Sequence, residues 1–447
     1  MLKTSNEARL LTSAAQAGVC QPATSAGKPG RGGVSNEQPR RRPTNSRDFL
    51  LMLFVVALSG NPVLGTPGAV RFIIPVAALL LGLAVLHKKR LSVSRRGFSI
   101  LALFGGIIAL QTVHFQVFSA VTILGQLCRF AIAYCAVVLI PDFAGTYVRV
   151  MLALAVLSFV FYFSYLGGVV LGIDVAALTR PFALYAAPNG ECSSILLHTF
   201  FSDPPDAYRN AGMFWEPGAF AGYVNLALVL LCLIRERFTK RAYLVRFAVL
   251  SVCLLTTKST VGYIAYAVVL CLEVMARERP GGRAKLFGYL GAGFVLAFFC
   301  ALAANLEFIA PKIENSILVA TTQTGGWQAD RLGSILFDLD YITARPLTGW
   351  GMRQETRLAL NPELTDIEAN GRGNGMSNFA ATFGIVALVM WLVSSYKTLL
   401  LLSPQRKILA VLGLLVLVIS LNGECFLNFP LFLMFFFSSG PRACYEL

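Results

Sequence analysis

The sequence predicts an all-α integral membrane protein with about twelve membrane-spanning helices. Its 447 residues are 56% hydrophobic and only 14% charged, whereas soluble domains carry roughly 25% charged residues. Long apolar runs also recur along the whole chain, and a run of about 20 apolar residues is long enough to cross a bilayer as a helix. Both observations indicate a multi-pass membrane protein.

Each apolar run is a candidate span. Several of the twelve runs, among them 244–257 and 408–421, are shorter than the roughly 20 residues that a crossing helix needs. The other ten candidates are 49–65, 69–86, 98–113, 117–140, 148–172, 213–234, 259–275, 286–304, 379–402 and 424–439.

The placement of basic residues predicts that both chain ends lie in the cytoplasm. With the N-terminus inside, the segments assigned to the inner side hold 26 Lys and Arg, and those assigned to the outer side hold 10 over more residues. Cytoplasmic connections of membrane proteins carry the excess of Lys and Arg. Topology therefore accounts for the net charge of +15, and we expect no nucleic-acid partner.

This topology divides the chain into seven segments. The first is polar and rich in Ser, Gly, Pro and Arg, which predicts a disordered basic tail followed by an uncleaved first helix. The two long loops are both external, and loops of this length are uncommon unless they are functional. The segments are a cytoplasmic tail (1–48), spans 1–5 (49–172), a first external loop (173–212), spans 6–9 (213–304), a large external loop (305–378), spans 10–12 (379–439) and a cytoplasmic tail (440–447).

The sequence supports neither a disulfide framework nor a metal site. Most of the ten cysteines lie in apolar runs, no Cys-x-x-Cys spacing occurs, and the three histidines are scattered. Asp338-Leu339-Asp340 is the only candidate for an external Asp-x-Asp metal motif, and its amphipathic context favours a solvated helix face. We therefore expect no metal and no other cofactor.

Four motifs lie in segments predicted to face outward. They are Arg209-x-x-Gly212-x-x-x-Glu216-Pro217, Thr257-Lys258-Ser259, Arg331-Leu-Gly-Ser-Ile-Leu-Phe-Asp338 with Arg345-Pro346-Leu347-Thr348-Gly349-Trp350-Gly351, and Gly375-Met376-Ser377-Asn378. Glu216-Pro217 also has an ordinary explanation, because an acidic residue and Pro are common at a helix start. Trp350 is predicted to be a membrane-interface anchor, with sugar stacking as the alternative.

In this order and on this side of the membrane, the motifs resemble the O-antigen polymerase and O-antigen ligase superfamily of bacterial envelope enzymes. The resemblance covers about residues 205–390 and implies a GT-C-like helical architecture in the bacterial inner membrane. It also implies a substrate, an oligosaccharide on undecaprenyl diphosphate, and pathway partners such as a flippase and a chain-length regulator. Positions that match supporting motif residues are Gly212, Pro217, Ser259, Pro346, Gly349, Gly351 and Asn378.

Three basic residues are candidates for binding the lipid diphosphate. The guanidinium fork of Arg matches phosphate oxygens, so we assign Arg209 and Arg331 to this role, with Lys258 as an additional point charge. The helix start at Pro217 can add backbone donors. A solvated surface position is the ordinary alternative for each basic residue.

The mechanism that the resemblance implies is inverting glycosyl transfer. A hydroxyl of the acceptor sugar attacks the anomeric carbon of the donor, and the lipid diphosphate leaves while cations stabilise its charge, without a metal. Glu216 or Asp338 is the candidate base for that hydroxyl.

We expect a polymerase of lipid-linked repeat units that forms O-antigen, capsule or exopolysaccharide. A ligase that moves glycan onto lipid A core is the first alternative, but ligases of the family typically carry a His where this chain has Ser377. A flippase or transporter of the same glycan is the second. A transporter would concentrate polar groups near the middle of the bilayer on broken helices. Arg129 is the one charged residue predicted to lie at that depth.

The basic tail supplies the first test. Charges that flank the first span usually dominate orientation, so neutralising Arg40, Arg41, Arg42 and Arg47 should increase the fraction of inverted molecules. Deleting residues 1–38 should leave activity intact. Reporter fusions at position 190 measure orientation, and fusions that stay fully external after neutralisation would contradict the prediction.

Overall fold

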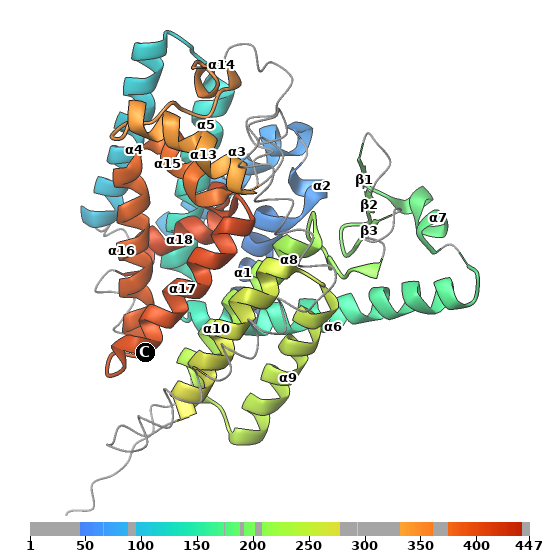
Figure 1. The fold of residues 1–447 in the computed structure, drawn as a ribbon. Coiled ribbons are helices and arrows are strands. Elements are labelled where there is room, and N and C mark those ends of the chain that lie inside the picture. Colours follow the sequence, from blue (N-terminus) through green and yellow to red (C-terminus); the bar gives the residue numbers. More distant parts are fainter. Residues whose placement is uncertain are drawn as a thin grey trace, which may run out of the picture. The chain divides into compact units, whose positions relative to one another are not determined.

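The computed structural model describes a mostly α-helical protein with one small β-sheet (Figure 1). Six of the described helices are long and apolar enough to cross a membrane, in agreement with the predicted class. The described residues are 45–65, 67–87, 95–173, 175–187, 192–201, 208–277, 293, 331–360 and 374–439.

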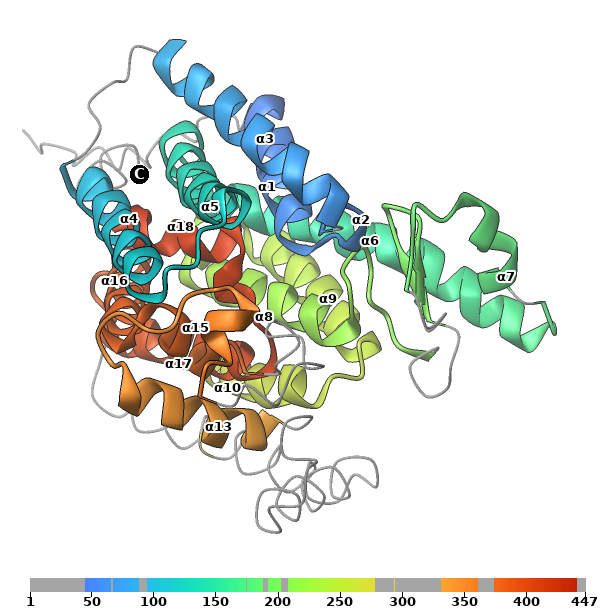
Figure 2. The ribbon, with the colours of Figure 1, turned by 90° about the horizontal axis from the view of Figure 1, so that it is seen from above.

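The six long helices carry exposed apolar side chains, as contact with lipid requires. On α3, Phe72, Leu79 and Leu80 are 75%, 62% and 60% exposed, a pattern that would be a large apolar patch on a soluble protein. The six are α3 (Pro67–His87), α4 (Arg95–Phe115), α5 (Ala120–Leu139), α6 (Phe143–Val170), α10 (Thr260–Arg277) and α16 (Ile385–Leu402). In Figure 2, α3 and the later helix α13 (Arg331–Ala344) lie at opposite margins of the helices.

Several predicted spans are shorter or divided in the structure. In the span predicted at 49–65, the first helix ends at Gly60. Asn61 has an extended backbone conformation and donates its side-chain amide to Met213 O at 3.1 Å. The span predicted at 424–439 contains only nine helical residues, since its helix starts at Pro430, which follows a 3₁₀ turn. The span predicted at 286–304 lies outside the described residues, apart from residue 293.

Three shorter helices follow the predicted apolar runs closely, namely α8 (Pro217–Leu233), α9 (Lys240–Thr256) and α17 (Lys407–Gly423). The two divided runs form α1 (Ser46–Gly60) with α2 (Pro62–Gly65), and η4 (Phe426–Asn428) with α18 (Pro430–Ser438).

The span predicted at 379–402 is two helices rather than one. α15 (Gly375–Phe383) and α16 are separated by Gly384, whose φ of +89° favours glycine. A Cβ at Gly384 would lie 2.2 Å from Leu347 O. The break therefore lets a loop segment approach the backbone of the helix.

Helix α8 forms the centre of the apolar core. Every residue of α8 except Gly218 is buried, and a helix that is hydrophobic on all sides belongs inside a bundle. It packs against α6, α9, α10 and α17. Because α8 begins at Pro217, this central helix places the motif around Glu216 at one end of the bundle.

Hydrogen bonds between the segments that connect the spans fall into two groups. This division is expected when successive helices cross a membrane in alternating directions. One group joins segments that were all predicted to be external or at external span ends, and the other joins internal segments. The first includes Asn61 with Met213, Gln111 with Thr348, Trp215 with Glu424, and Asn374 with Asn422. The second includes Arg237 with Asp142 and Arg406 with Ala276. Which group faces the cytoplasm remains a prediction.

A small antiparallel sheet lies within the first loop that was predicted to be external, in a chain that is otherwise helical where the structure describes it. Its strands are β1 (Tyr185–Ala186), β2 (Cys192–Ser194) and β3 (Thr199–Phe201), in that order. They follow α7 (Val175–Thr179) and η1 (Arg180–Phe182), beside the C-terminal end of α6 in Figure 1. Thr199 N donates to Gly212 O at 2.7 Å, which ties the sheet to the entrance of α8.

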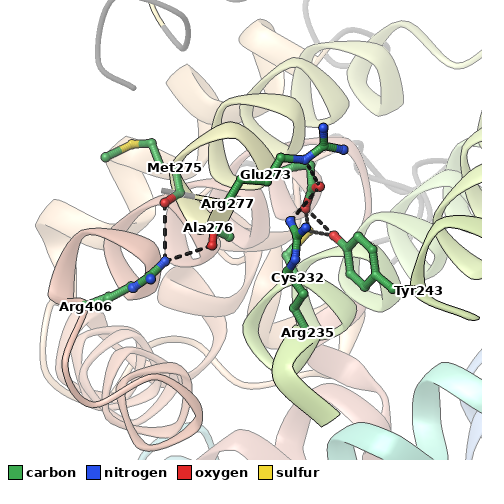
Figure 3. Close-up of polar contacts among 8 residues, drawn as sticks. All are labelled: Cys232, Arg235, Tyr243, Glu273, Met275, Ala276, Arg277 and Arg406. Atoms are coloured by element: carbon green, nitrogen blue, oxygen red, sulfur yellow. Dashed lines mark hydrogen bonds and ion pairs between the residues drawn. The ribbon is translucent and has the colours of Figure 1, made fainter. Parts of the chain in front are cut away.

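A polar cluster around Glu273 joins helices at the opposite end (Figure 3). Glu273 is 3% exposed and accepts hydrogen bonds from Arg235 Nη1 at 3.0 Å, Arg277 Nε at 2.6 Å and the Tyr243 hydroxyl. Arg235 belongs to η3 (Arg235–Arg237), directly after α8. The carboxylate therefore links the ends of α8, α9 and α10.

Replacing Glu273 with Ala should destabilise the protein by about 3 kcal/mol, because two arginines and a buried hydroxyl lose their acceptor. Thermal unfolding of the purified protein in lipid nanodiscs measures the change. Glu236→Ala, at an exposed position one residue from Arg235, is the matched control. Equal melting temperatures for the two variants would contradict the prediction.

Candidate functional site

A buried ion pair joins three helices of the large predicted loop and the span after it. Arg357, at the end of α14 (Gln354–Arg357), donates through Nη2 to Asp338 Oδ1 on α13, and the two side chains are 1% and 0% exposed. Ser377 Oγ on α15 donates to Asp338 Oδ2 at 2.7 Å. The prediction that Asp338 lies on a solvated helix face is wrong, because the loop folds inward over it. Asp340 is exposed, as predicted.

Two nitrogen atoms of Arg357 have no hydrogen-bond partner among the described residues. Nη2 also lies 3.4 Å from Asn378 Oδ1, whereas the buried Nε and Nη1 are unsatisfied. The guanidinium carbon lies 4.9 Å from the centre of the Tyr341 ring. Buried donors without partners are rare and costly. Arg357 is therefore the strongest candidate anion-binding residue in the described part of the chain.

The turn that contains Gly349 docks onto the break between α15 and α16. Gly349 has a φ of +64°, and a Cβ there would lie 2.4 Å from Thr382 O. Trp350 N donates to Ala381 O at 2.9 Å, and Pro346 O accepts from Ile385 N at 2.7 Å. This backbone docking holds the segment that leads into α14, and thus places Arg357.

Trp350 is a packing residue. Its side chain is 6% exposed, and its indole Nε1 donates to Tyr341 O at 2.8 Å. The Arg345 guanidinium lies 4.8 Å from its ring centre. Both predicted roles, interface anchor and sugar platform, need an exposed ring face, so the structure corrects them. Gly351, with a φ of +81°, continues the turn.

The motif around Arg209 is anchored to the end of α9. Arg209 is half-buried and donates through Nε to Thr257 O at 3.1 Å, while Asn210 N donates to Thr256 O at 3.0 Å. Gly212 has a φ of +53°, and a Cβ there would lie 2.9 Å from the Phe220 ring. The local geometry thus explains the Arg and Gly of this motif, at the entrance of α8, by helix capping and close packing.

Two carboxylates meet at the start of α8. Pro217 occupies the first turn, and Glu216 is the N-cap residue without a side-chain capping bond. A Cβ at Gly218 would lie 2.7 Å from Glu216 Oε1 and 3.1 Å from Glu424 Oε1. Glu424, on the connection after α17, accepts from Trp215 Nε1 at 3.3 Å. The sequence drew attention to Glu216 alone, since Glu424 is more than 200 residues away.

The motif around Lys258 contributes a cap and an exposed charge. Ser259 is buried and its hydroxyl accepts from Gly262 N at 3.2 Å, which caps α10. Lys258 is exposed with a φ of +47°, and its ammonium lies 5.9 Å from the Tyr208 ring centre. Ser259 and Glu424 line one cavity of about 10 Å³, which has room for about one water.

The structure brings most of the predicted residues to the external group of segments. Asp338 and Asn378 meet through Arg357, while Ser259 and Gly218 line one cavity. Arg331 begins α13, but its side chain lies outside what the structure describes. The sequence did not predict a role for Arg357. Its local sequence, Gln-Glu-Thr-Arg, does not distinguish a buried arginine from a solvated one.

No family model, no curated protein and no solved structure matches this chain. Within the described residues, no group of three or more His, Cys, Asp or Glu side chains is placed to hold a metal ion. The functional argument therefore rests on the site itself.

The loop sheet contains a histidine that makes its stability sensitive to acid. Burial against Phe161 and Phe200 lowers the pKa of His198 from 6.5 to about 3. Stability is fully present above pH 6.5 and falls as the pH drops, because the unfolded state then binds a proton that the folded state does not. At pH 5 the loss is on the order of 2 kcal/mol. Hydrogen exchange of residues 192–201 at pH 7.5 and pH 5 measures it.

His198→Phe keeps an aromatic ring between Phe161 and Phe200 and removes the titration. This variant should lose most of the acid sensitivity of the sheet. The same pH dependence in the variant and in the unaltered protein would show that another group is responsible.

Proposed function

We propose that this protein is a glycosyltransferase of the bacterial inner membrane that polymerises oligosaccharide repeat units linked to undecaprenyl diphosphate. The product would be O-antigen, capsule or exopolysaccharide at the outer face. The observation that carries the proposal is the buried Arg357, which Asp338 holds in place while Nε and Nη1 lack partners among the described residues. A buried arginine with unsatisfied donors suits an anion such as a diphosphate, because hydrogen bonds between a guanidinium and phosphate oxygens are charge-assisted and strong.

The arrangement supports leaving-group stabilisation. The oxygen of the acceptor hydroxyl forms a bond to the anomeric carbon of the donor, and the bond from that carbon to the diphosphate breaks. The negative charge that develops on the diphosphate is stabilised by Arg357, with Arg209, Arg331 and Lys258 as further cations. Because Arg357 is buried, α13 or α14 must shift to admit the diphosphate, as loops over active sites do.

Glu216 is the proposed base for the acceptor hydroxyl. It is half-buried at the N-terminus of α8, and its Oε1 and the Oε1 of Glu424 lie 2.7 and 3.1 Å from the position that a Cβ would take at Gly218. Asp338 is a weaker choice than the sequence suggested, because both of its oxygens already accept hydrogen bonds from Arg357 and Ser377. Asp338 instead positions Arg357.

A transporter of lipid-linked glycan is the second candidate, and one observation favours it. The break between α15 and α16 at Gly384 is the kind of discontinuous helix on which transporters build binding sites. Asn378 and Ser377, two buried polar residues of the helix before the break, contact the Asp338–Arg357 pair. They therefore belong to the proposed polymerase site. The ligase alternative keeps the same site, with Ser377 where family ligases carry His.

The decisive experiment is polymer formation in proteoliposomes supplied with a lipid-diphosphate-linked repeat unit. Arg357→Lys keeps a cation beside Asp338 but loses the two additional donors, so we expect about a hundredfold slower polymerisation. Gel electrophoresis of the polymer and the release of undecaprenyl diphosphate give the rate, with protein abundance measured in parallel.

Arg406→Lys is the matched control, because Arg406 donates to Ala276 O at the opposite end of the bundle. It should polymerise at a near-normal rate. Normal polymerisation by Arg357→Lys would remove the central observation from the proposal. Transport of the substrate across the vesicle membrane without any polymer would favour the transporter.

A further inference from the structure

A second cavity, of about 40 Å³, lies between α4, α5 and the segment that leads into α14. This volume holds about three water-sized groups, so it suits one edge of a larger polar molecule. The lining residues that matter here are Gln111, Thr112, Phe115, Ser119, Thr122, Gln126, Arg353 and Thr356. Thr356 is the one among these residues that is adjacent in sequence to a residue of the proposed diphosphate site, Arg357.

Gln126 gives this cavity its clearest indication of a ligand. Its side chain is 2% exposed, and its amide Nε2 has no hydrogen-bond partner among the described residues. The amide Oε1 has only a long contact, 3.5 Å from Arg129 Nη1. A buried amide without a partner costs about 1–3 kcal/mol. A ligand atom that accepts from Nε2 would recover that energy.

The other lining groups are neutral donors and acceptors. Ser119 Oγ and Thr122 Oγ1 lie 3.0 Å apart and share one hydrogen bond, and Ser119 Oγ also accepts from Thr122 N at 3.4 Å, which leaves an acceptor lone pair on Thr122 Oγ1. Gln111 is held by bonds to Thr348 O and Thr382 O, so the wall it forms is rigid. The ring of Phe115 adds an apolar wall.

The positive charge beside the cavity is already paired with a carboxylate. Arg353 is the one charged residue among those that line it, and its Nε donates to Glu355 Oε2 at 3.1 Å. A phosphate would need unpaired cationic donors, whereas a group of neighbouring hydroxyls needs the mixture of amide and hydroxyl groups found here. The chemistry of the lining therefore selects a polyhydroxylated neutral ligand.

We propose that this cavity is a sugar subsite that holds hydroxyl groups of the glycan chain. The inference rests on the proposed function, because it places the glycan beside the diphosphate site. Thr356 lines the cavity and Arg357, the next residue of α14, belongs to the buried ion pair. Adjacent Cα atoms are about 3.8 Å apart, so one short helix turn borders both the sugar subsite and the anion site.

Sugar binding can be measured without turnover. The probes are methyl glycosides of glucose, galactose, mannose, rhamnose and N-acetylglucosamine, with glycerol phosphate as a lipid-headgroup mimic. The readout is saturation-transfer NMR on the purified protein in lipid nanodiscs, since detergents with sugar headgroups would compete. At least one methyl glycoside should bind, and glycerol phosphate should not displace it.

Gln126→Leu fills similar space without the amide and should weaken that binding at least tenfold. Thr122→Val is a second variant, at the rim, and should weaken it severalfold if Gln126→Leu fails to fold. Ser164→Ala removes an exposed hydroxyl of α6, away from the cavity, and should bind as the unaltered protein does.

The outcomes separate this inference from the proposed function. Sugar binding that depends on Gln126, in a protein that makes no polymer, supports the subsite and counts against the polymerase. Polymer formation with no glycoside binding, or with binding that Gln126→Leu and Thr122→Val leave unchanged, overturns the subsite alone. Displacement of the glycoside by glycerol phosphate would assign the cavity to a lipid headgroup and also overturn it.

Discussion

The burial of Asp338 together with Arg357 is the constraint on which this end of the helix bundle depends. Two opposite charges removed from water are tolerated only when the geometry of the pair is good and neighbouring groups satisfy the remaining atoms. Ser377 and Asn378 supply part of that satisfaction from α15. The pair thus requires α13, α14 and α15 to meet in one arrangement. The described parts of the large predicted loop, residues 331–360 and 374–378, are consequently part of the folded bundle.

Backbone contacts make that arrangement possible. Gly349 and Gly384 each allow a carbonyl oxygen to approach where a side chain would clash, with would-be Cβ contacts of 2.4 Å and 2.2 Å. The turn before α14 therefore lies directly against the break between α15 and α16. A continuous helix through 375–402 would offer no free backbone groups there, since its own hydrogen bonds would use them. The helix break is in this sense a docking site for the loop.

The short helix α14 borders two kinds of chemistry. On one side Arg357 presents guanidinium donors beside an acidic partner, and on the other Thr356 lines a neutral cavity with an unpaired Gln126 amide. A lipid-linked glycan has the same division, an anionic diphosphate joined to neutral sugars. In the proposed reaction, Glu216 at the start of α8 is the acceptor for the proton of the sugar hydroxyl. Each group comes from a different part of the chain.

Composition and apolar run length determined the membrane class, most helix positions and the helix start at Pro217, because these are local properties. The same reasoning predicted a solvated Asp338 and an undivided span at 379–402, and the structure corrects both. Only the tertiary structure showed the burial and the partners of Arg357, Glu424 and Gln126. Whether a polar side chain is buried, and with which partner, depends on distant segments that fold over it. No local pattern in the sequence reports that contact.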